Sequence, residues 1–308
     1  MLEGRLPAGE RILLTGATGQ VGGELLKLLA GLGEVVAPAR AEMDLADAGS
    51  VREAIRKVRP RWIVNPGAYT AVDKAESEPA LAYAVNAEAV RVMGEEARAI
   101  GAGVIHFSTD YVFDGTGDVP YRETDATGPV SVYGASKLAG EKALAESGAG
   151  HLIFRTSWVY GGVGKNFLLT ILKLAREREV LRVVGDQHGA PTWSRELARM
   201  TVRVIGRCEA AAQGRELVDV LAEVGGVYHA AGAGETTWYG FAAEAVRLQR
   251  EAEAGVRFAE IEAITTAEYP TPAKRPCNSR MNCSKLSDGF GWTMMDWRES
   301  LRKVLSER

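Results

Sequence analysis

Near its N-terminus the chain reads Thr15-Gly16-Ala17-Thr18-Gly19-Gln20-Val21-Gly22, a pattern of the form TGxxGxxG. An apolar run over residues 11–14 precedes it, and residues 24–30 show the leucine spacing of a helix. Glycines placed between a strand and a helix permit a tight turn, a close approach to a pyrophosphate and close packing of the helix on the strand. The pattern therefore predicts a dinucleotide site formed by Gly16, Thr18, Gly19, Gln20, Val21 and Gly22. The alternative, a glycine-rich turn without a ligand, is left open.

Strand and helix patterns alternate after this loop. Apolar runs predict strands over 35–37, 61–65, 103–107 and 151–155, and helical spacing predicts helices over 51–58, 79–100 and 136–147. Parallel strands joined by helical crossovers are the economical arrangement of such a pattern. We therefore expect an α/β fold, a Rossmann-like doubly wound parallel sheet with a smaller C-terminal substrate-binding part.

The predicted domains are discontinuous in sequence. Residues 10–160 with 191–228 are expected to form the dinucleotide-binding domain, and residues 161–190 with 229–308 the substrate-binding domain. Residues 1–9 are expected to form a short mobile tail.

Composition and charge exclude several classes of protein. The 308 residues are 46% hydrophobic and 25% charged with a formal net charge of -3, which argues against a disordered chain and against nucleic acid or an anionic membrane as a partner. No apolar run approaches the ~18 residues of a membrane span, and the N-terminus lacks the apolar core of a signal peptide. Three cysteines without a CxxC pair favour the reducing cytoplasm.

The four histidines are scattered without metal-ligand spacing, so we predict no metal site in the protein itself and leave a divalent-metal requirement open. Histidines within predicted strands are interpreted as packed core residues.

The choice of nicotinamide cofactor depends on the residues after the second predicted strand. NAD-binding sheets usually carry a carboxylate there for the ribose hydroxyls, whereas this strand ends at Arg40. Arg40 is suited to a 2′-phosphate, which favours NADPH with NADH as the alternative; a solvated surface arginine is the competing interpretation. Asp44 and Leu45 are expected beside the adenine.

Tyr133-Gly134-Ala135-Ser136-Lys137 forms a YxxxK motif. Four-residue spacing places the tyrosine and the lysine on one face of a helix. A phenol with a pKa near ~10 exchanges protons poorly at neutral pH, and a nearby ammonium favours its anion. A third group is needed for the substrate oxygen, and Ser108-Thr109 ends a predicted strand upstream. Together with the glycine loop, these residues indicate proton-transfer chemistry beside a nicotinamide.

At these motifs the chain resembles an extended short-chain dehydrogenase/reductase, and further blocks resemble the dTDP-4-dehydrorhamnose reductase family. The resemblance extends from about residue 11 to the C-terminus. The blocks that carry it are Asn65 to Glu76, Ser108 to Gly115, Arg155 to Gly161, Asp186 to Trp193 and Arg275 to Ser279. Pro66-Gly67 and Met281-Asn282-Cys283 depart from the usual pattern of the family.

The resemblance implies reduction of the 4-keto group of a dTDP-4-dehydro-6-deoxy-L-sugar to dTDP-L-rhamnose. It implies that Tyr133 is the proton donor, Lys137 its electrostatic partner and Thr109 the hydrogen-bond donor to the carbonyl. The lysine is also expected to hold the cofactor with Tyr133. Ala68, Tyr69 and Thr70 are expected along the cofactor, and the sugar nucleotide is expected to contact Thr109, Asp110, Tyr111, Trp158, Asn166 and Gln187. A homodimer is one open arrangement.

Two other functions remain open from the sequence. The first is a reductase or epimerase acting on another nucleotide-activated sugar, and an epimerase would show no net cofactor consumption. The second is a non-catalytic regulatory subunit resembling the β subunit associated with methionine adenosyltransferase. The intact Thr109, Tyr133 and Lys137 argue against this second function.

Overall fold

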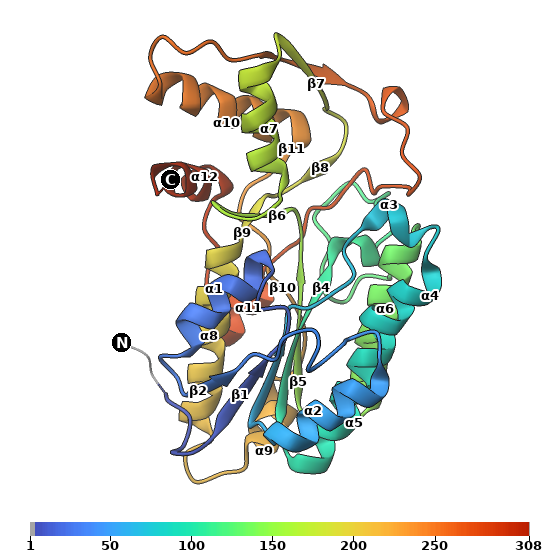
Figure 1. Cartoon of the computed structure of the whole chain (residues 1–308), viewed down its shortest axis with the longest axis vertical. Coiled ribbons are helices and arrows are strands. Elements are labelled where there is room, and N and C mark those ends of the chain that lie inside the picture. Colours follow the sequence, from blue (N-terminus) through green and yellow to red (C-terminus); the bar gives the residue numbers. More distant parts are fainter. Residues whose placement is uncertain (1–3, 308) are drawn as a thin grey trace.

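A computed structural model of the chain describes residues 4–307 and has a six-stranded parallel sheet at its centre (Figure 1). The strand order is β10-β5-β4-β3-β1-β2. The strands are β1 (Arg11–Leu14), β2 (Glu34–Val36), β3 (Trp62–Asn65), β4 (Gly103–Thr109), β5 (His151–Thr156) and β10 (Gly226–His229). β1 lies between β2 and β3, so the strand order reverses direction across the sheet at β1. Ligands bind at such a switch point in open α/β sheets. The predicted fold class is confirmed.

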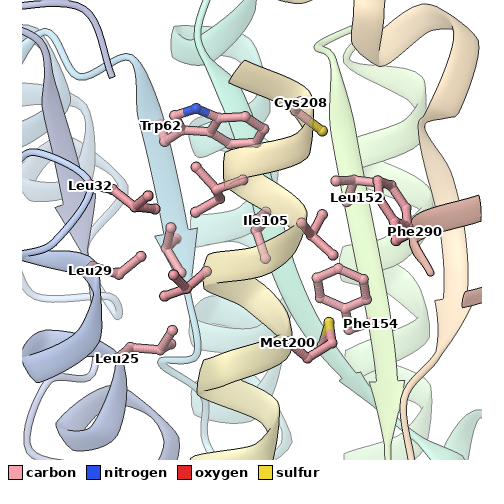
Figure 2. Packing of buried hydrophobic residues seen from close by; sticks show 14 of the residues in the cluster. Leu25, Leu29, Leu32, Trp62, Ile105, Leu152, Phe154, Met200, Cys208 and Phe290 are labelled. Atoms are coloured by element: carbon pink, nitrogen blue, oxygen red, sulfur yellow. The ribbon is translucent and has the colours of Figure 1, made fainter. Parts of the chain in front are cut away.

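One face of the sheet is covered by α1 (Gln20–Leu29) and α8 (Ser194–Ala211), with α9 (Leu217–Val224) and α11 (Ser284–Phe290) beside them. Alternate strand residues point to this face, as the two-residue period of a strand requires. Figure 2 shows Trp62, Ile105 and Phe154 among the side chains packed here between sheet and helices.

The opposite face is covered by α2 (Ala48–Val58), α5 (Ala89–Ile100) and α6 (Val132–Glu146) (Figure 1). It takes the intervening strand residues, such as Leu13, Ile63 and Val104, into a second core. Both faces of the sheet are therefore buried, which explains why its strands read as continuous apolar runs.

A smaller part of the chain lies beyond the carboxyl ends of the strands (Figure 1). It contains α7 (Phe167–Glu177), α10 (Trp238–Ala252) and α12 (Trp297–Ser306) with a core of its own. Its strands form three pairs: β7 (Val180–Val184) with β12 (Glu260–Ile264), β6 (Val159–Tyr160) with β9 (Thr192–Trp193), and β8 (His188–Gly189) with β11 (Thr236–Thr237). The carboxyl ends of the six-stranded sheet therefore face a separate cluster of helices.

The N-terminal segment and α11 pack into the same core as one face of the sheet. Leu6 is 8% exposed, its N–H donates to the carbonyl oxygen of Leu32, and it shares a hydrophobic cluster with Leu286 and Phe290 of α11. The expected mobile tail over 1–9 is therefore wrong from residue 4 onward, because Leu6 buries an apolar side chain, and residues 1–3 lie outside the described residues.

The long helix predicted over 79–100 is divided in three. It consists of α4 (Pro79–Tyr83), a π-helical turn (Ala84–Glu88) and α5, and the short α3 (Val72–Ala75) precedes it. The helix predicted to begin at residue 136 begins at Val132, because the Ser131 hydroxyl accepts a hydrogen bond from the N–H of Gly134 at 3.2 Å and caps it. Short 3₁₀ turns cover residues 110–112 and 266–268. Among the described helices, none is long and apolar enough to cross a membrane.

Candidate active site

The glycine loop joins β1 to α1, and its backbone requires glycine at two positions. Gly16 has a φ of 56°, in the left-handed region that favours glycine. A Cβ on Gly22 would lie 2.0 Å from the carbonyl oxygen of Gly16. Gly19 is the N-cap of α1 and donates its N–H to the same oxygen at 2.9 Å. The loop is therefore folded tightly against the first turn of the helix.

The N-terminus of α1 fits an anionic group. No side chain caps it and its first turn holds no acidic residue. The N–H groups of Gln20, Val21 and Gly22 lie in the first turn, where a helix offers no internal acceptor, and the helix dipole adds partial positive charge. Thr18 and Gly19 are exposed on the loop. These features suit the pyrophosphate of a dinucleotide.

We expect Gly22→Ala to weaken NADPH binding at least about tenfold and to lower the free energy of unfolding by about 1–3 kcal/mol, since the added methyl group displaces the Gly16 carbonyl. Cofactor titration by fluorescence and denaturant unfolding measure the two effects. Gly23→Ala is the matched control, because the nearest neighbour of its Cβ, the Ala17 oxygen, would lie 3.5 Å away. Equal affinities in the two variants would contradict the assignment of the loop.

Arg40, Asp44 and Leu45 follow β2 as predicted, and they differ in how they are held. The Arg40 side chain is 80% exposed, and its ion pair with Asp44 spans 3.5 Å at the surface. Asp44 also accepts a hydrogen bond from the N–H of Ala46 at 2.9 Å. Leu45 lies against Gly67, where an added Cβ would come within 2.7 Å of its Cδ1. Exposed ion pairs are weak, so Arg40 is free to turn toward a ligand.

The Pro66-Gly67 departure from the family pattern has a structural reason at Gly67. Its N–H donates to the Thr15 hydroxyl at 3.1 Å, and a Cβ there would lie 2.8 Å from that hydroxyl oxygen. The ends of β1 and β3 therefore meet closely at this glycine.

The segment Ala68, Tyr69 and Thr70 is held by Asn86, a residue that the sequence analysis missed. The Tyr69 N–H donates to Oδ1 of Asn86 at 2.8 Å, and Nδ2 of Asn86 donates to the Tyr69 carbonyl oxygen and to the Ser136 hydroxyl, both at 3.0 Å. Asn86 lies in the π-helical turn and is 1% exposed. The available signal was an asparagine, a poor helix former, within an alanine-rich helix.

Tyr133 and Lys137 lie on one face of α6, as the YxxxK spacing predicts. Two glycines let this helix approach its neighbours: a Cβ on Gly134 would lie 2.1 Å from the Tyr111 carbonyl oxygen, and one on Gly140 would lie 2.1 Å from that of Asn86. The face that carries Tyr133 is thereby pressed against the end of β4.

Thr109 ends β4 beside Tyr133, close enough for its hydroxyl to act on the pKa of the phenol. The Thr109 hydroxyl donates to Oδ1 of Asp110 at 3.0 Å and accepts from the N–H of Tyr111 at 3.2 Å. The Tyr111 ring meets the Tyr133 ring edge-on with 5.5 Å between centroids. The structure thus brings Thr109, Asp110, Tyr111 and Tyr133 together.

Burial dominates the electrostatics of this cluster. It raises the pKa of Tyr133 to about 12, against the opposing effect of the neighbouring Thr109 hydroxyl, so the phenol keeps its proton at neutral pH. The expectation that a nearby ammonium would favour the phenolate is not met here. Burial lowers the pKa of Lys137 to about 7, against the charge of Glu141. Burial also raises the pKa of Asp110 to about 6, while hydrogen bonds from Ser279 and Thr109 oppose it.

Trp158 and Gln187 lie directly before β6 and β8, two strands of the smaller part of the chain. Trp158 has a φ of 48°, and its ring stacks on that of Trp238 with 3.8 Å between centroids. A Cβ on Gly189 would come within 2.7 Å of the Trp158 ring. Gln187 is 4% exposed, and its Nε2 donates to the Thr266 hydroxyl at 3.1 Å. Trp158 is therefore fixed by aromatic stacking, and Gln187 by a hydrogen bond within the smaller part.

Asn166 is occupied by contacts within the protein. Its Nδ2 donates to Oε1 of Gln20 and to the carbonyl oxygen of Gly161, both at 3.0 Å, and its Oδ1 caps α7 through the N–H of Leu169. Gln20 in turn donates to the Val159 carbonyl oxygen at 3.3 Å. These two amides join the glycine loop to the smaller part of the chain, and a contact of Asn166 with the sugar nucleotide stays a prediction.

Over residues 4–307, no group of three or more histidine, cysteine, aspartate or glutamate side chains is arranged to hold a metal ion.

Comparison with known proteins connects this geometry to one family. Residues 10–308 match the family model described as RmlD substrate binding domain. The chain is 47% identical to the dTDP-4-dehydrorhamnose reductase of Escherichia coli K12, over 96% of this chain and 97% of that protein. It is also 47% identical to the dTDP-4-dehydrorhamnose reductase of Burkholderia thailandensis, over 96% of this chain and the full length of that protein.

One solved structure has a similar fold over nearly the whole length of both chains. The dTDP-4-dehydrorhamnose reductase of Bacillus anthracis, in complex with NADP, superposes with a TM-score of 0.86 at 32% identity, over 97% of this chain and 99% of that chain. The predicted family resemblance is confirmed by these matches.

Proposed function

The chain belongs to the RmlD substrate binding domain family, and on that premise we propose that it is an NADPH-dependent oxidoreductase that reduces the 4-keto group of a dTDP-4-dehydro-6-deoxy-L-sugar to give dTDP-L-rhamnose. The observation that carries the proposal is the 47% identity, over nearly the full length of both chains, with reductases of that name. The neighbouring hydroxyl groups of Thr109 and Tyr133 support it, since a ketone reductase needs hydrogen-bond donors at the carbonyl oxygen.

In the proposed mechanism, the glycine loop would hold a nicotinamide cofactor, which would supply a hydride for the carbonyl carbon. Thr109 donates a hydrogen bond to the carbonyl oxygen and stabilises the negative charge that develops there. Tyr133 gives its phenolic proton to that oxygen, so that hydride and proton together complete the alcohol. The raised pKa of Tyr133 keeps this proton in place until the oxygen becomes a strong base. Lys137 lies one turn further along α6, on the same face of the helix as Tyr133.

We assign the sugar side of the site to Asp110, Tyr111 and Trp158. Tyr111 contacts the ring of the proposed proton donor, and the rigid stack of Trp158 on Trp238 offers a flat apolar surface. Such surfaces pack against the apolar faces of sugar rings and bases.

The test is oxidation of NADPH and NADH, followed by absorbance, with enzymatically prepared dTDP-4-keto-6-deoxy-L-sugar and identification of the product. We expect NADPH oxidation with formation of dTDP-rhamnose. Oxidation only with another sugar nucleotide would move the assignment to that sugar, and cofactor binding without oxidation of any would favour a regulatory subunit.

Arg40 is the residue on which we base the preference for NADPH. We expect Arg40→Ala to raise the KM for NADPH about tenfold, because a charge-assisted contact with the 2′-phosphate is lost. The KM for NADH serves as the internal control and is expected to stay within about twofold. Equal changes for both cofactors would contradict a contact with the 2′-phosphate.

We propose three further features of the organisation of the protein. They are the division into residues 10–160 with 191–228 and 161–190 with 229–308, a homodimer, and a cytoplasmic location. The free Cys208, Cys277 and Cys283 support a reducing compartment.

A further inference from the structure

A row of four buried polar side chains lies beneath the candidate active site. It runs from Thr15 after β1, through Asn65 of β3 and His106 of β4, to Lys137 of α6. Their exposed fractions are 4%, 1%, 1% and 2%. Asn65 and His106 are partners in the register of β3 and β4, so their side chains lie on the same face of the sheet. The row thus connects the edge of the glycine loop to the lysine of the YxxxK motif.

Hydrogen bonds link the row without a break. The Thr15 hydroxyl lies 2.5 Å from Oδ1 of Asn65, and Nδ2 of Asn65 lies 3.0 Å from Nδ1 of His106. Nε2 of His106 lies 3.1 Å from Nζ of Lys137, which also donates to the Phe107 carbonyl oxygen at 2.5 Å. His106 is therefore a buried strand histidine, as expected from the sequence, and it is hydrogen-bonded at both ring nitrogens.

The direction of these bonds fixes where protons lie. The Gly67 N–H donates to Thr15, Thr15 donates to Oδ1 of Asn65, and the Asn65 amide donates to Nδ1 of His106. A neutral His106 then carries its proton on Nε2, facing Lys137. An N–H group at that position requires a lone pair on Nζ, so this orientation suits the neutral amine of Lys137.

A half-turn of the Asn65 amide group reverses the direction of the hydrogen bonds along the row. Its oxygen then accepts from Nδ1 of His106, and the lone pair on Nε2 accepts from Lys137. This orientation suits the ammonium form of Lys137, but it leaves the Thr15 hydroxyl proton without the acceptor it has in the first orientation. The row therefore has two hydrogen-bonded arrangements, one for each protonation state of the lysine.

The surrounding charges leave His106 neutral in both arrangements. Burial and the charge of Lys137 hold the pKa of His106 well below its usual value, and His151 acts weakly in the same direction. Lys137 faces Glu141 on its own helix, and Glu141 is paired with Arg155 of β5 at 2.7 Å. Because the ring stays uncharged, it responds to the lysine by moving its proton between its two nitrogens.

We propose that His106 is a positioning residue that holds Nζ of Lys137 and, by exchanging its tautomer together with a half-turn of Asn65, stabilises either protonation state of that lysine. When the ammonium form gives way to the amine, Nε2 of His106 takes a proton from Nζ of Lys137, the Nδ1–H bond breaks, and that proton leaves to solvent, so the pair loses one proton in all. The proposal concerns the protein's own residues, and only its kinetic test rests on the proposed function.

The direct test is nitrogen NMR of the full chain labelled with ¹⁵N-histidine, titrated through the pKa of Lys137 of about 7. The His106 signals are assigned by their loss in His106→Phe. We expect a neutral ring throughout, with the proton on Nδ1 at low pH and on Nε2 at high pH. A single tautomer across the titration, or protonation of the ring to the cation near neutral pH, would overturn the proposal.

The kinetic test uses two substitutions with opposite expected signs. His106→Phe removes the partner of Nζ, and burial without a partner penalises the ammonium, so we expect the Lys137 inflection in kcat/KM to move about one pH unit lower. Asn65→Asp presents only acceptors and adds negative charge, so we expect the inflection to move about one unit higher. If His106 and Asn65 had only structural roles, both substitutions would lower activity and leave the inflection in kcat/KM at the same pH. That result would refute the proposal.

His229→Phe is the matched control for the first substitution. His229 is a strand histidine with 0% exposure on β10, hydrogen-bonded to the Tyr121 carbonyl oxygen and outside the row. We expect this variant to lose stability and to keep the inflection of the unchanged protein. Should His106→Phe unfold, His106→Gln, which retains a donor and an acceptor, is expected to fold and to give an inflection between those of His106→Phe and the unchanged protein.

Discussion

Replacing Tyr133 by phenylalanine is expected to lower kcat by about 10²–10⁴-fold while the KM for NADPH stays within about twofold. The substitution removes the phenolic proton but keeps the ring that packs edge-on against Tyr111. Burial holds Tyr133 protonated, so the substitution removes a proton that the alkoxide would otherwise receive. Steady-state NADPH oxidation, with cofactor affinity measured separately, gives the two quantities.

Tyr228→Phe controls for the loss of a phenol in general. Its hydroxyl donates to the Val224 carbonyl oxygen at 2.6 Å, at the outer edge of the sheet, so kcat is expected to be unchanged. Turnover in Tyr133→Phe equal to that of Tyr228→Phe would end the proposed mechanism.

The largest expected effect on stability comes from the buried ion pair of Glu141 and Arg155. Nη2 of Arg155 lies 2.7 Å from the carboxylate, and both side chains are 5% exposed. Glu141→Ala leaves a guanidinium buried without its counter-charge, since Nη1 of Arg155 also has no partner among the described residues. We expect the free energy of unfolding to fall by about 3–5 kcal/mol, measured by denaturant titration.

Two further variants separate the charge from the packing. The double change Glu141→Leu with Arg155→Met removes both charges and is expected to recover most of the loss. Glu251→Ala breaks an exposed pair with Arg247 and is expected to cost less than about 1 kcal/mol. A small loss in Glu141→Ala, similar to that in Glu251→Ala, would show that the buried pair does not hold α6 to β5.

The sequence predicted the central strands well because their signal is local. Each of β1, β3, β4 and β5 is an apolar run buried on both faces, and each was expected within two residues of its position in the structure. The TGxxGxxG and YxxxK motifs were equally readable, since their spacing is short and refers to one turn or one helix face.

What the sequence could not predict depends on contacts between distant segments. The π-helical turn at Ala84–Glu88 contains no glycine or proline to mark it, and it places Asn86 against Tyr69 and Ser136. The buried row depends on strand order, because Asn65 and His106 meet only when β3 and β4 are neighbours. The roles of His106 and Asn86 therefore appear only in the folded chain.

The packing of the N-terminal segment and α11 into one core has a consequence for how the protein folds. Leu6 and Phe290 contribute to the same cluster, and β10, formed by residues 226–229, closes the edge of the sheet. The part of the chain up to residue 160 is thus not a separable folding unit, because a fragment ending there would leave apolar surface uncovered. Native structure has to wait until nearly the whole polypeptide has been synthesised, and we expect its thermal unfolding to be one cooperative calorimetric transition.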